Sequence, residues 1–278
     1  MIAFLARLRR LDRRWIFLTV GLLVVVPLLT GFHIAPVLPG SRAKGFYDAI
    51  ERVPAGSTVL LAGDYDPGTI AENYPMHLAA ARHLMARNIK IVSVELYPGG
   101  PPLADRVLHI AGEEFKKRES YDYVNLGYKS GNEVVMSQMG SSIPRTFPTD
   151  RSGIPVGQLP VMKGIENFGQ IALLVSISAG YPGTKEWVQQ IVSRYHVPMV
   201  AGVTAVSAPE YYPYLQAGQL QGLLGGMAGA AEYEVLVGHP ALATRGMDAQ
   251  SLAHIFIAFM ILLGNLAALP QRSPGERK

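Results

Sequence analysis

The sequence predicts an α/β domain with a mostly parallel β-sheet, flanked by two transmembrane helices. Two long apolar runs lie near the chain ends, strand-like and helix-like segments alternate between them, and arginine and lysine concentrate in the two tails. The chain has 278 residues, of which 49% are hydrophobic and 17% are charged. This balance is too apolar for a disordered protein and too polar for a transporter with many spans. The chain contains no cysteine, which excludes a disulfide framework, a cysteine metal site and a cysteine nucleophile.

The first apolar run comprises the seventeen uncharged residues from Ile16 to Phe32. This length is at the lower limit for a membrane span, and Trp15 lies at its edge, where interfacial aromatic side chains are common. We therefore predict a transmembrane helix over residues 15–33, preceded by a basic tail over residues 1–14. A cleaved signal peptide is the alternative, but no clear small-x-small cleavage site follows the run.

The second apolar run extends over residues 252–269 and has only two strongly polar members, His254 and Asn265. A soluble helix of this length is rarely apolar on every face, so the run predicts a second transmembrane helix. An asparagine in lipid needs a hydrogen-bond partner, so Asn265 is expected to face the first span or another copy of the chain. Residues 270–278 form a second basic tail.

The distribution of positive charge predicts the orientation of both spans. The tails at residues 1–14 and 270–278 carry net charges of +4 and +2, which leaves about −2 for the rest of the chain. The other flanks of the two spans hold only three basic residues, Arg42, Lys44 and Arg245. The positive-inside rule then places both tails in the cytoplasm and residues 34–251 on the opposite side of the cell membrane. A domain without a basic face is not expected to bind nucleic acid.

Between the spans, segments typical of strands and helices alternate. The predicted strands are residues 57–62, 89–96, 121–127, 171–178 and 197–203, and the predicted helices are residues 41–51, 69–87, 102–119 and 183–195. The strand segments are near-continuous apolar runs, which favours a parallel sheet with both faces buried, in a Rossmann-like arrangement. Residues 129–169, rich in proline, glycine and serine, are too long for an ordinary connection, so we expect a functional or interface excursion there.

Acidic residues stand at the ends of the first two predicted strands, where an open α/β sheet binds its ligands. Asp64 and Asp66 follow the first strand, and Glu95 ends the second. Three carboxylates on neighbouring strand ends form a candidate ligand or catalytic site that could hold a divalent cation through oxygen atoms. The alternative is that Asp64 and Asp66 shape a turn and cap the following helix.

The segment from residue 64 to residue 69, DYDPGT, resembles the first motif of the haloacid-dehalogenase phosphatases, which is Asp-x-Asp-x-Thr at a strand end. The threonine stands one residue farther along here than in that motif. The later acidic pair of that family, which carries its second metal site, has no counterpart in the chain. The resemblance is therefore limited to one loop and assigns no family.

The end of the fourth predicted strand offers further candidate ligand-binding residues, namely Ser176, Ser178, Gly180 and Tyr181. Two serines and a glycine at a strand-to-helix turn are a loose form of the nucleophile elbow, which makes Ser178 a candidate catalytic residue. Such a hydrolase needs an acid and then a histidine later in the chain, and Glu232 or Glu234 followed by His239 have this order. The alternative is a tight turn that needs small side chains.

The most unusual segment is residues 218–238, in which small residues recur at helical spacing. Four glycines are expected to form a close-packed helix interface, within the chain or between copies: Gly222, Gly225, Gly226 and Gly229. Each glycine costs a helix about 1 kcal/mol relative to alanine, and the close approach of another backbone offsets this loss. A glycine-rich ligand loop is the alternative.

Together these features favour a membrane-anchored extracytoplasmic binding or assembly module, either an oligomer or a subunit of a membrane complex. The expected partners are the lipid bilayer and further copies of the chain, and no particular cofactor is predicted. The alternative is a membrane-tethered hydrolase that uses the strand-end carboxylates, with or without a metal, or Ser178. An enzyme requires these side chains to converge on one open pocket, whereas an assembly module requires a flat apolar or small-residue surface.

Overall fold

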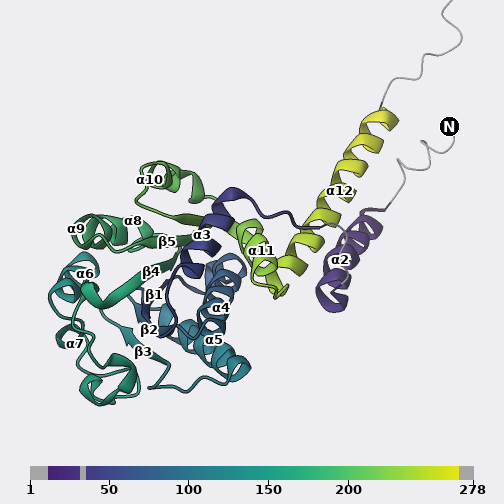
Figure 1. Cartoon of the computed structure of the whole chain (residues 1–278). Helices are drawn as coiled ribbons and strands as arrows, with labels where there is room; N and C mark the ends of the chain where they lie inside the picture. Colours follow the sequence, from purple (N-terminus) through teal and green to yellow (C-terminus); the bar gives the residue numbers. More distant parts are fainter. Residues whose placement is uncertain (1–11, 32–35, 269–278) are drawn as a thin grey trace, which may run out of the picture. The chain divides into compact units, whose positions relative to one another are not determined.

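The structure is a computed structural model that describes residues 12–31 and 36–268 (Figure 1). The chain divides into two units. Residues 37–244 form an α/β domain, and the second unit combines residues 1–36 with residues 245–278. Most of the two predicted basic tails lies outside the described residues.

The domain is built on a six-stranded sheet in which all strands are parallel, in the order β3-β2-β1-β4-β5-β6. The strands are β1 (Thr58–Asp64), β2 (Lys90–Glu95), β3 (Tyr123–Tyr128), β4 (Ile171–Ser178), β5 (Met199–Val203) and β6 (Gly222–Gly225). The first five confirm the predicted strands to within two residues at each end, whereas β6 is absent from the prediction. The strand order reverses between β1 and β4, so the carboxyl ends of these strands flank the switch point of the sheet.

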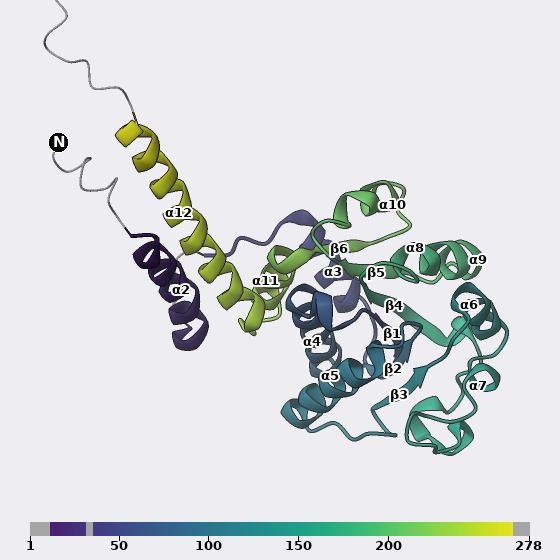
Figure 2. The ribbon, with the colours of Figure 1, turned by 180° about the vertical axis from the view of Figure 1, so that it is seen from behind.

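Helices cover both faces of the sheet, as its apolar strands require (Figures 1 and 2). One face is covered by α3 (Ser41–Glu51), α4 (Ile70–Ala86), α5 (Gly100–Phe115) and α11 (Gly226–Leu236). The other face is covered by α6 (Asn132–Ser141), α7 (Ile143–Thr146), α8 (Thr184–Trp187), α9 (Ser193–Tyr195) and α10 (Tyr212–Gln216). A π-helical turn, Val188–Val192, joins α8 to α9.

Residues 129–169 form part of this second layer. Their apolar side chains enter the core that lies under β1, β2 and β3, as Met136, Met139, Ile143, Phe147, Leu159, Val161, Met162 and Phe168 do. The segment is organised as α6, α7 and short 3-10 turns, which follow one another without long irregular stretches. Its high proline and glycine content conceals this structural role. A functional or interface role for the segment stays a prediction.

The expectation of a single helix over residues 218–238 is wrong. Gly222–Gly225 form the edge strand β6, and α11 begins only at Gly226, whose φ is +62°. A Cβ atom on Gly222 would lie 2.0 Å from the backbone nitrogen of Phe46, so the glycine allows α3 to cross directly over the strand. The glycine-rich segment thus serves the close packing of β6 and α11 inside the domain.

The candidate interface glycines all face elements of the same chain. Added Cβ atoms on Gly225 and Gly226 would meet the Cβ atoms of Ala208 and Ala205 at 2.9 and 2.5 Å. A Cβ atom on Gly229 would lie 3.0 Å from the backbone of Leu224. The close backbone approach that the sequence predicts is therefore found within one chain.

The second unit contains two apolar helices, α2 (Arg13–Thr30) and most of α12 (Leu242–Ala268). Both are long and apolar enough to cross a membrane, and α12 begins ten residues before the predicted start of the second span. The helix α2 ends at Gly31, which has a left-handed conformation with φ of +65°. The side chain of Arg245 in the first turn of α12 lies beside this glycine, so the end of α2 meets the start of α12, and the two helices run in opposite directions (Figure 1).

The contact between Gly222 and α3 yields a first prediction. We expect Gly222→Ala to lower the stability of the domain by about 1–3 kcal/mol, because the new methyl group collides with backbone that has no room to move. Thermal unfolding followed by circular dichroism measures the change. Gly157→Ala is the matched control, since no atom lies within 4 Å of its added Cβ, and it should melt like the wild type. Equal melting of the two variants would show that β6 and α3 are not in close contact.

Candidate functional site

The candidate site lies at the carboxyl ends of β1 and β4, where the strand order reverses. Asp64 and Ser178 are directly paired across these two strands, and the backbone N–H of Ala179 donates to the carbonyl of Asp64 at 3.0 Å. Both side chains are buried on the same face of the sheet, the one covered by α8. Asp64 and Ser178 thus lie side by side at the ends of neighbouring strands.

Asp64 connects three elements through its carboxyl group. Its Oδ1 accepts a hydrogen bond from the backbone N–H of Leu96 at 2.6 Å, and its Oδ2 accepts one from the indole Nε1–H of Trp187 at 2.8 Å. Burial raises the pKa of Asp64 from 3.8 to about 6, although these hydrogen bonds act in the opposite direction. Both oxygens are engaged, so this carboxyl group fastens β2 and α8 to β1.

Glu95 points to the opposite face of the sheet from Asp64. It shares the face of Ser93, whose Oγ–H donates to Glu95 Oε1 at 2.7 Å, while Oε2 has no hydrogen-bond partner among the described residues. Burial raises the pKa of Glu95 from 4.5 to about 8, and the nearby charge of Asp64 adds to this shift. Successive side chains of a strand alternate between faces, and this alternation separates the two carboxyl groups.

Asp66 occupies a turn, as the alternative reading of the sequence predicts. Its Oδ1 accepts from the backbone N–H of Gly68 at 2.7 Å, and its Oδ2 accepts from the hydroxyl of Tyr97 at 3.3 Å. Within residues 12–31 and 36–268, no group of three or more histidine, aspartate and glutamate side chains is arranged to hold a metal ion. The structure therefore does not bring Asp64, Asp66 and Glu95 together as the divalent-cation site that the sequence suggests.

Ser176 and Ser178 hold the beginning of α8. The hydroxyl of Thr184 lies 3.1 Å from Ser176 Oγ and 2.9 Å from Ser178 Oγ, and the backbone N–H of Thr184 donates to Ser178 Oγ at 3.0 Å. All three side chains are buried. These bonds are those of a tight strand-to-helix turn, so Ser178 lacks the open position that a nucleophile needs.

The acid and histidine of the hydrolase hypothesis lie elsewhere and have other partners. Glu232 accepts from the backbone N–H of Gly40 at 2.9 Å, and the buried Glu234 accepts backbone hydrogen bonds from the residues that begin α12. The ring of His239 packs edge-on against Phe115 at 6.0 Å. The structure thus does not assemble these residues with Ser178.

Gly180 and Tyr181 are the exposed members of the predicted ligand-binding set. Gly180 has φ of +96°, and Tyr181 extends into solvent while its hydroxyl donates to Glu133 Oε2 at 2.7 Å. This bond ties the loop after β4 to the start of α6. The open part of the strand-end region is therefore a loop surface and not a pocket around the carboxyl groups.

A buried polar pair on α4 was not anticipated from the sequence. The hydroxyl of Tyr65 lies 3.0 Å from Nδ1 of His77, and the Nδ2 amide of Asn73 donates to the carbonyl of Ser178 at 3.0 Å. Burial lowers the pKa of His77 from 6.5 to about 3, which keeps the imidazole neutral. Asn73 and His77 are four residues apart, which places both on one face of the helix. This spacing is the sequence pattern that could have indicated a buried polar pair.

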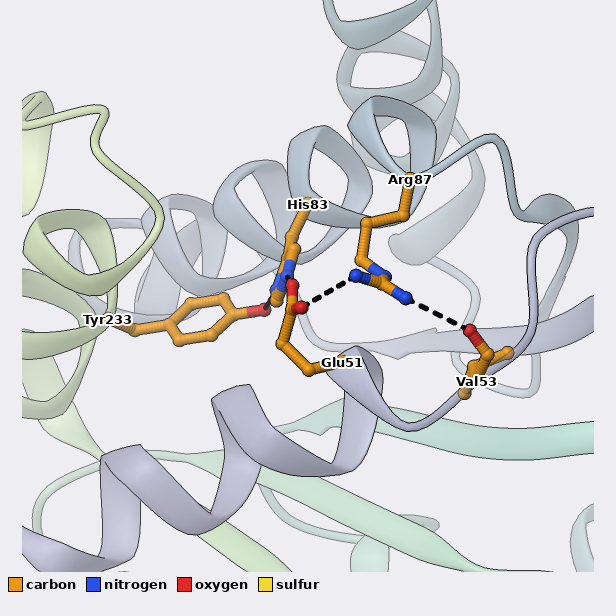
Figure 3. A network of polar contacts seen from close by, with 5 residues as sticks. All are labelled: Glu51, Val53, His83, Arg87 and Tyr233. Carbon is orange, nitrogen blue, oxygen red and sulfur yellow. Dashed lines mark hydrogen bonds and ion pairs between the residues drawn. The ribbon is translucent and has the colours of Figure 1, made fainter.

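A second, partly buried network joins three helices on this face of the sheet (Figure 3). Glu51 of α3 contacts His83 Nε2 at 2.8 Å and Arg87 Nη1 at 2.6 Å, and the hydroxyl of Tyr233 lies 2.7 Å from His83 Nδ1. A carboxylate only accepts, so Nε2 carries the proton and Nδ1 accepts from the phenol. Burial lowers the pKa of His83 and raises that of Tyr233, so both stay neutral and fasten α3 and α11 to α4.

Comparisons of the chain with protein-family models, with curated proteins and with solved structures find no match. The chemistry of the site is therefore interpreted from its own geometry. Asp64, Glu95, Ser176 and Ser178 are buried and each makes a hydrogen bond to another residue of the domain, which is the arrangement of groups that stabilise a fold.

The raised pKa of Glu95 generates a second prediction. The folded protein retains a proton on Glu95 up to about pH 8, whereas the unfolded chain loses it near pH 4.5. The stabilisation that this proton gives the folded protein is complete below the pKa of Glu95 in the unfolded chain. It is lost as the pH rises through the pKa of Glu95 in the folded protein, at up to about 1.4 kcal/mol per pH unit. Asp64, whose folded pKa is about 6, and His77, whose folded pKa is about 3, affect stability mainly at lower pH, so Glu95 dominates the window from pH 6.5 to pH 8.

The wild-type protein in detergent should therefore melt at a lower temperature at pH 8 than at pH 6.5. Glu95→Gln carries no titrating proton and should melt at nearly the same temperature at both values. The exposed Glu119→Gln is the control and should retain the wild-type decrease. A wild-type melting temperature that rises over this interval would contradict the proposed protonation of Glu95.

Proposed function

We propose that the protein is a membrane-anchored extracytoplasmic binding or assembly module with a Rossmann-like domain. The strand order 3-2-1-4-5-6 supports the Rossmann-like assignment, because it is the order of the doubly wound dinucleotide-binding fold. That fold serves many unrelated functions, so the site decides the activity. The function proposed here follows from the surfaces that the two units expose.

Exposed apolar side chains on α2 and α12 support membrane anchoring. Large apolar residues point outward along both helices, among them Phe17, Leu22, Leu29, Ile255, Phe259 and Leu262. A soluble protein rarely exposes a contiguous apolar surface of this extent, whereas lipid covers it without cost. The arginine-rich tails favour a topology with both ends in the cytoplasm and the domain outside.

The apolar part of α12 is as long as a bilayer's hydrocarbon core is thick. Gly31 and Arg245 lie side by side, and Asn265 follows Arg245 by twenty residues, or about 30 Å along the helix. This distance equals the thickness of a bilayer's hydrocarbon core. Asn265 would then lie at the inner headgroup level. Trp15, sixteen residues before Gly31 on α2, would lie about 24 Å from the outer boundary and so about 6 Å short of that level. The exposed side chain of Asn265 therefore needs no partner helix, which revises the expectation for this residue.

The burial of the strand-end polar groups favours binding or assembly over catalysis, and this observation carries the proposal. Asp64, Glu95 and Ser178 are at most 2% exposed, and their hydrogen bonds join neighbouring strands and helices. A nucleophile or a general base must instead reach a substrate. The hydrolase alternative thus has no geometric support among the described residues.

The loops at the carboxyl edge of the sheet present the surface that we assign to a partner. Four large apolar side chains are exposed there: Tyr128, Val134, Tyr181 and Val206. Val206, which follows β5, is 90% exposed. Exposed apolar side chains on loops that a rigid scaffold positions are typical of binding surfaces. The candidate interface glycines pack against elements of their own domain. We therefore place the contact between copies at the carboxyl edge of the sheet.

The proposed topology predicts which positions are reachable from outside the cell. Because the chain lacks cysteine, single cysteines can be introduced without competing thiols. We expect Val206→Cys to react with a membrane-impermeant maleimide in intact spheroplasts, and Ser273→Cys in the C-terminal tail to react only after lysis. The opposite pattern would place the domain in the cytoplasm. Reaction of both variants in a membrane-free supernatant would exclude anchoring.

The assembly proposal predicts the copy number of the detergent-purified chain. Native mass spectrometry should detect a complex larger than the monomer, and it reports any retained ligand in the same measurement. Val206→Asp places a charge in the apolar contact and should shift the distribution toward monomer with the fold retained. Tyr121→Asp, exposed at the opposite edge of the sheet, is the control and should assemble like the wild type. A monomeric wild type would contradict self-assembly.

A further inference from the structure

Both ends of the domain's chain are fastened to one helix, α11. At the entry, the backbone N–H of Gly40 donates to Glu232 Oε2 at 2.9 Å. At the exit, Glu234 accepts from the backbone N–H groups of Ala241, Ala243 and Thr244 and from the hydroxyl of Thr244, at 2.7 to 3.0 Å. The chain therefore enters and leaves the domain within the length of this helix.

The contacts of Glu234 leave no free linker between α11 and α12. The first N–H groups of a helix lack partners within the helix, and the carboxylate of Glu234 supplies them for α12. Glu234 is 2% exposed, so water hardly competes for these bonds. Thr244 is the last residue of the domain and precedes Arg245, the first residue of the apolar unit. Glu234 thus binds the C-terminal end of α11 to the last residues of the domain in the sequence.

Apolar side chains are exposed at this end of the domain. Leu38, just before the entry point, is 80% exposed, and Leu242, in the first turn of α12, is 53% exposed. Three consecutive apolar residues at the end of α11, Val235, Leu236 and Val237, are only partly buried. Arg42 and Lys44, four and six residues after Leu38, are exposed on α3, and the guanidinium of Arg42 lies over the ring of Tyr212. Segments that combine exposed apolar side chains with basic residues are typical of a membrane interface.

We propose that the end of α11, together with Leu38 and Leu242, rests in the headgroup region of the outer leaflet. This inference rests on the proposed membrane anchoring. If Arg245 and Gly31 mark the outer boundary of the hydrocarbon, Leu242 lies three residues beyond it, about 4.5 Å along the helix. The polar interface of a bilayer is about 5–7 Å deep on each side, so Leu242 remains within it. We expect lipid to cover this surface, because Thr244 of the domain is covalently joined to Arg245 of the apolar helix. This connection exists whether or not the domain binds another ligand.

A position near the other edge strand of the sheet can serve as a reference for this surface. β6, which contacts α11 and α3, is one edge strand, and β3 is the other. Val134 follows β3 in the chain and is exposed. A lipid contact confined to the end of α11 should therefore be absent at Val134.

Depth-dependent fluorescence quenching tests this proposal in the full chain. Leu38→Cys, Leu242→Cys and Val134→Cys are each labelled with bimane and reconstituted into phosphatidylcholine vesicles that carry a headgroup spin label. All three positions are exposed, so the label does not enter the core of the domain. Phe259→Cys, in the middle of α12, reports insertion of the helix with a spin label placed deep in the acyl chain.

We expect several-fold stronger headgroup quenching at residues 38 and 242 than at residue 134, with quenching of residue 259 by the deep label. If residue 259 is quenched but residues 38 and 242 behave like residue 134, the inference is wrong and membrane anchoring stands. If residue 259 is not quenched, the proposed anchoring fails and the inference fails with it. A blue-shifted emission at residues 38 and 242 without lipid quenching would also overturn it, because protein, such as a second copy, would then cover this surface.

Discussion

A parallel sheet must be covered on both faces, and this constraint shapes most of the domain. The central strands β1 and β4 are apolar on both sides, so any face left open would expose a continuous hydrophobic surface. The helices α3, α4, α5 and α11 cover one face. The long connection from β3 to β4 supplies much of the cover on the other, and for this reason a segment rich in proline and glycine carries core side chains such as Met139 and Phe168.

The same constraint explains the polar groups at the strand ends. Once both faces are covered, a carboxyl group there loses water and must find protein partners or remain protonated. Asp64 has partners on β2 and α8, whereas Glu95 has Ser93 for one oxygen only, and burial raises its pKa further. The two side chains differ in pKa because they face different layers. Their chemistry is that of fold stabilisation, although their position resembles that of an active site.

The sequence was sufficient for the five long strands and the helices between them, because each strand is a near-continuous apolar run of ordinary length. It was insufficient for β6, since four residues that include two glycines lack the β-branched side chains that identify a strand. The strand-end positions of Asp64, Glu95 and Ser178 were predictable, but the faces to which they point and their burial were not. These depend on sheet register and on covering elements such as Trp187, far away in the chain. The network of Glu51, His83 and Tyr233 likewise joins residues too distant in sequence for any local pattern to reveal.

The contact between Glu234 and the first turn of α12 also has a mechanical consequence. A flexible linker absorbs a pull on a tethered domain by extending, and little of the force reaches the span. Here a buried carboxylate with four hydrogen bonds holds Ala241, Ala243 and Thr244, the last residues of the domain, to the end of α11. A pull along the chain at this point must break the hydrogen bonds of Glu234 before these residues can extend.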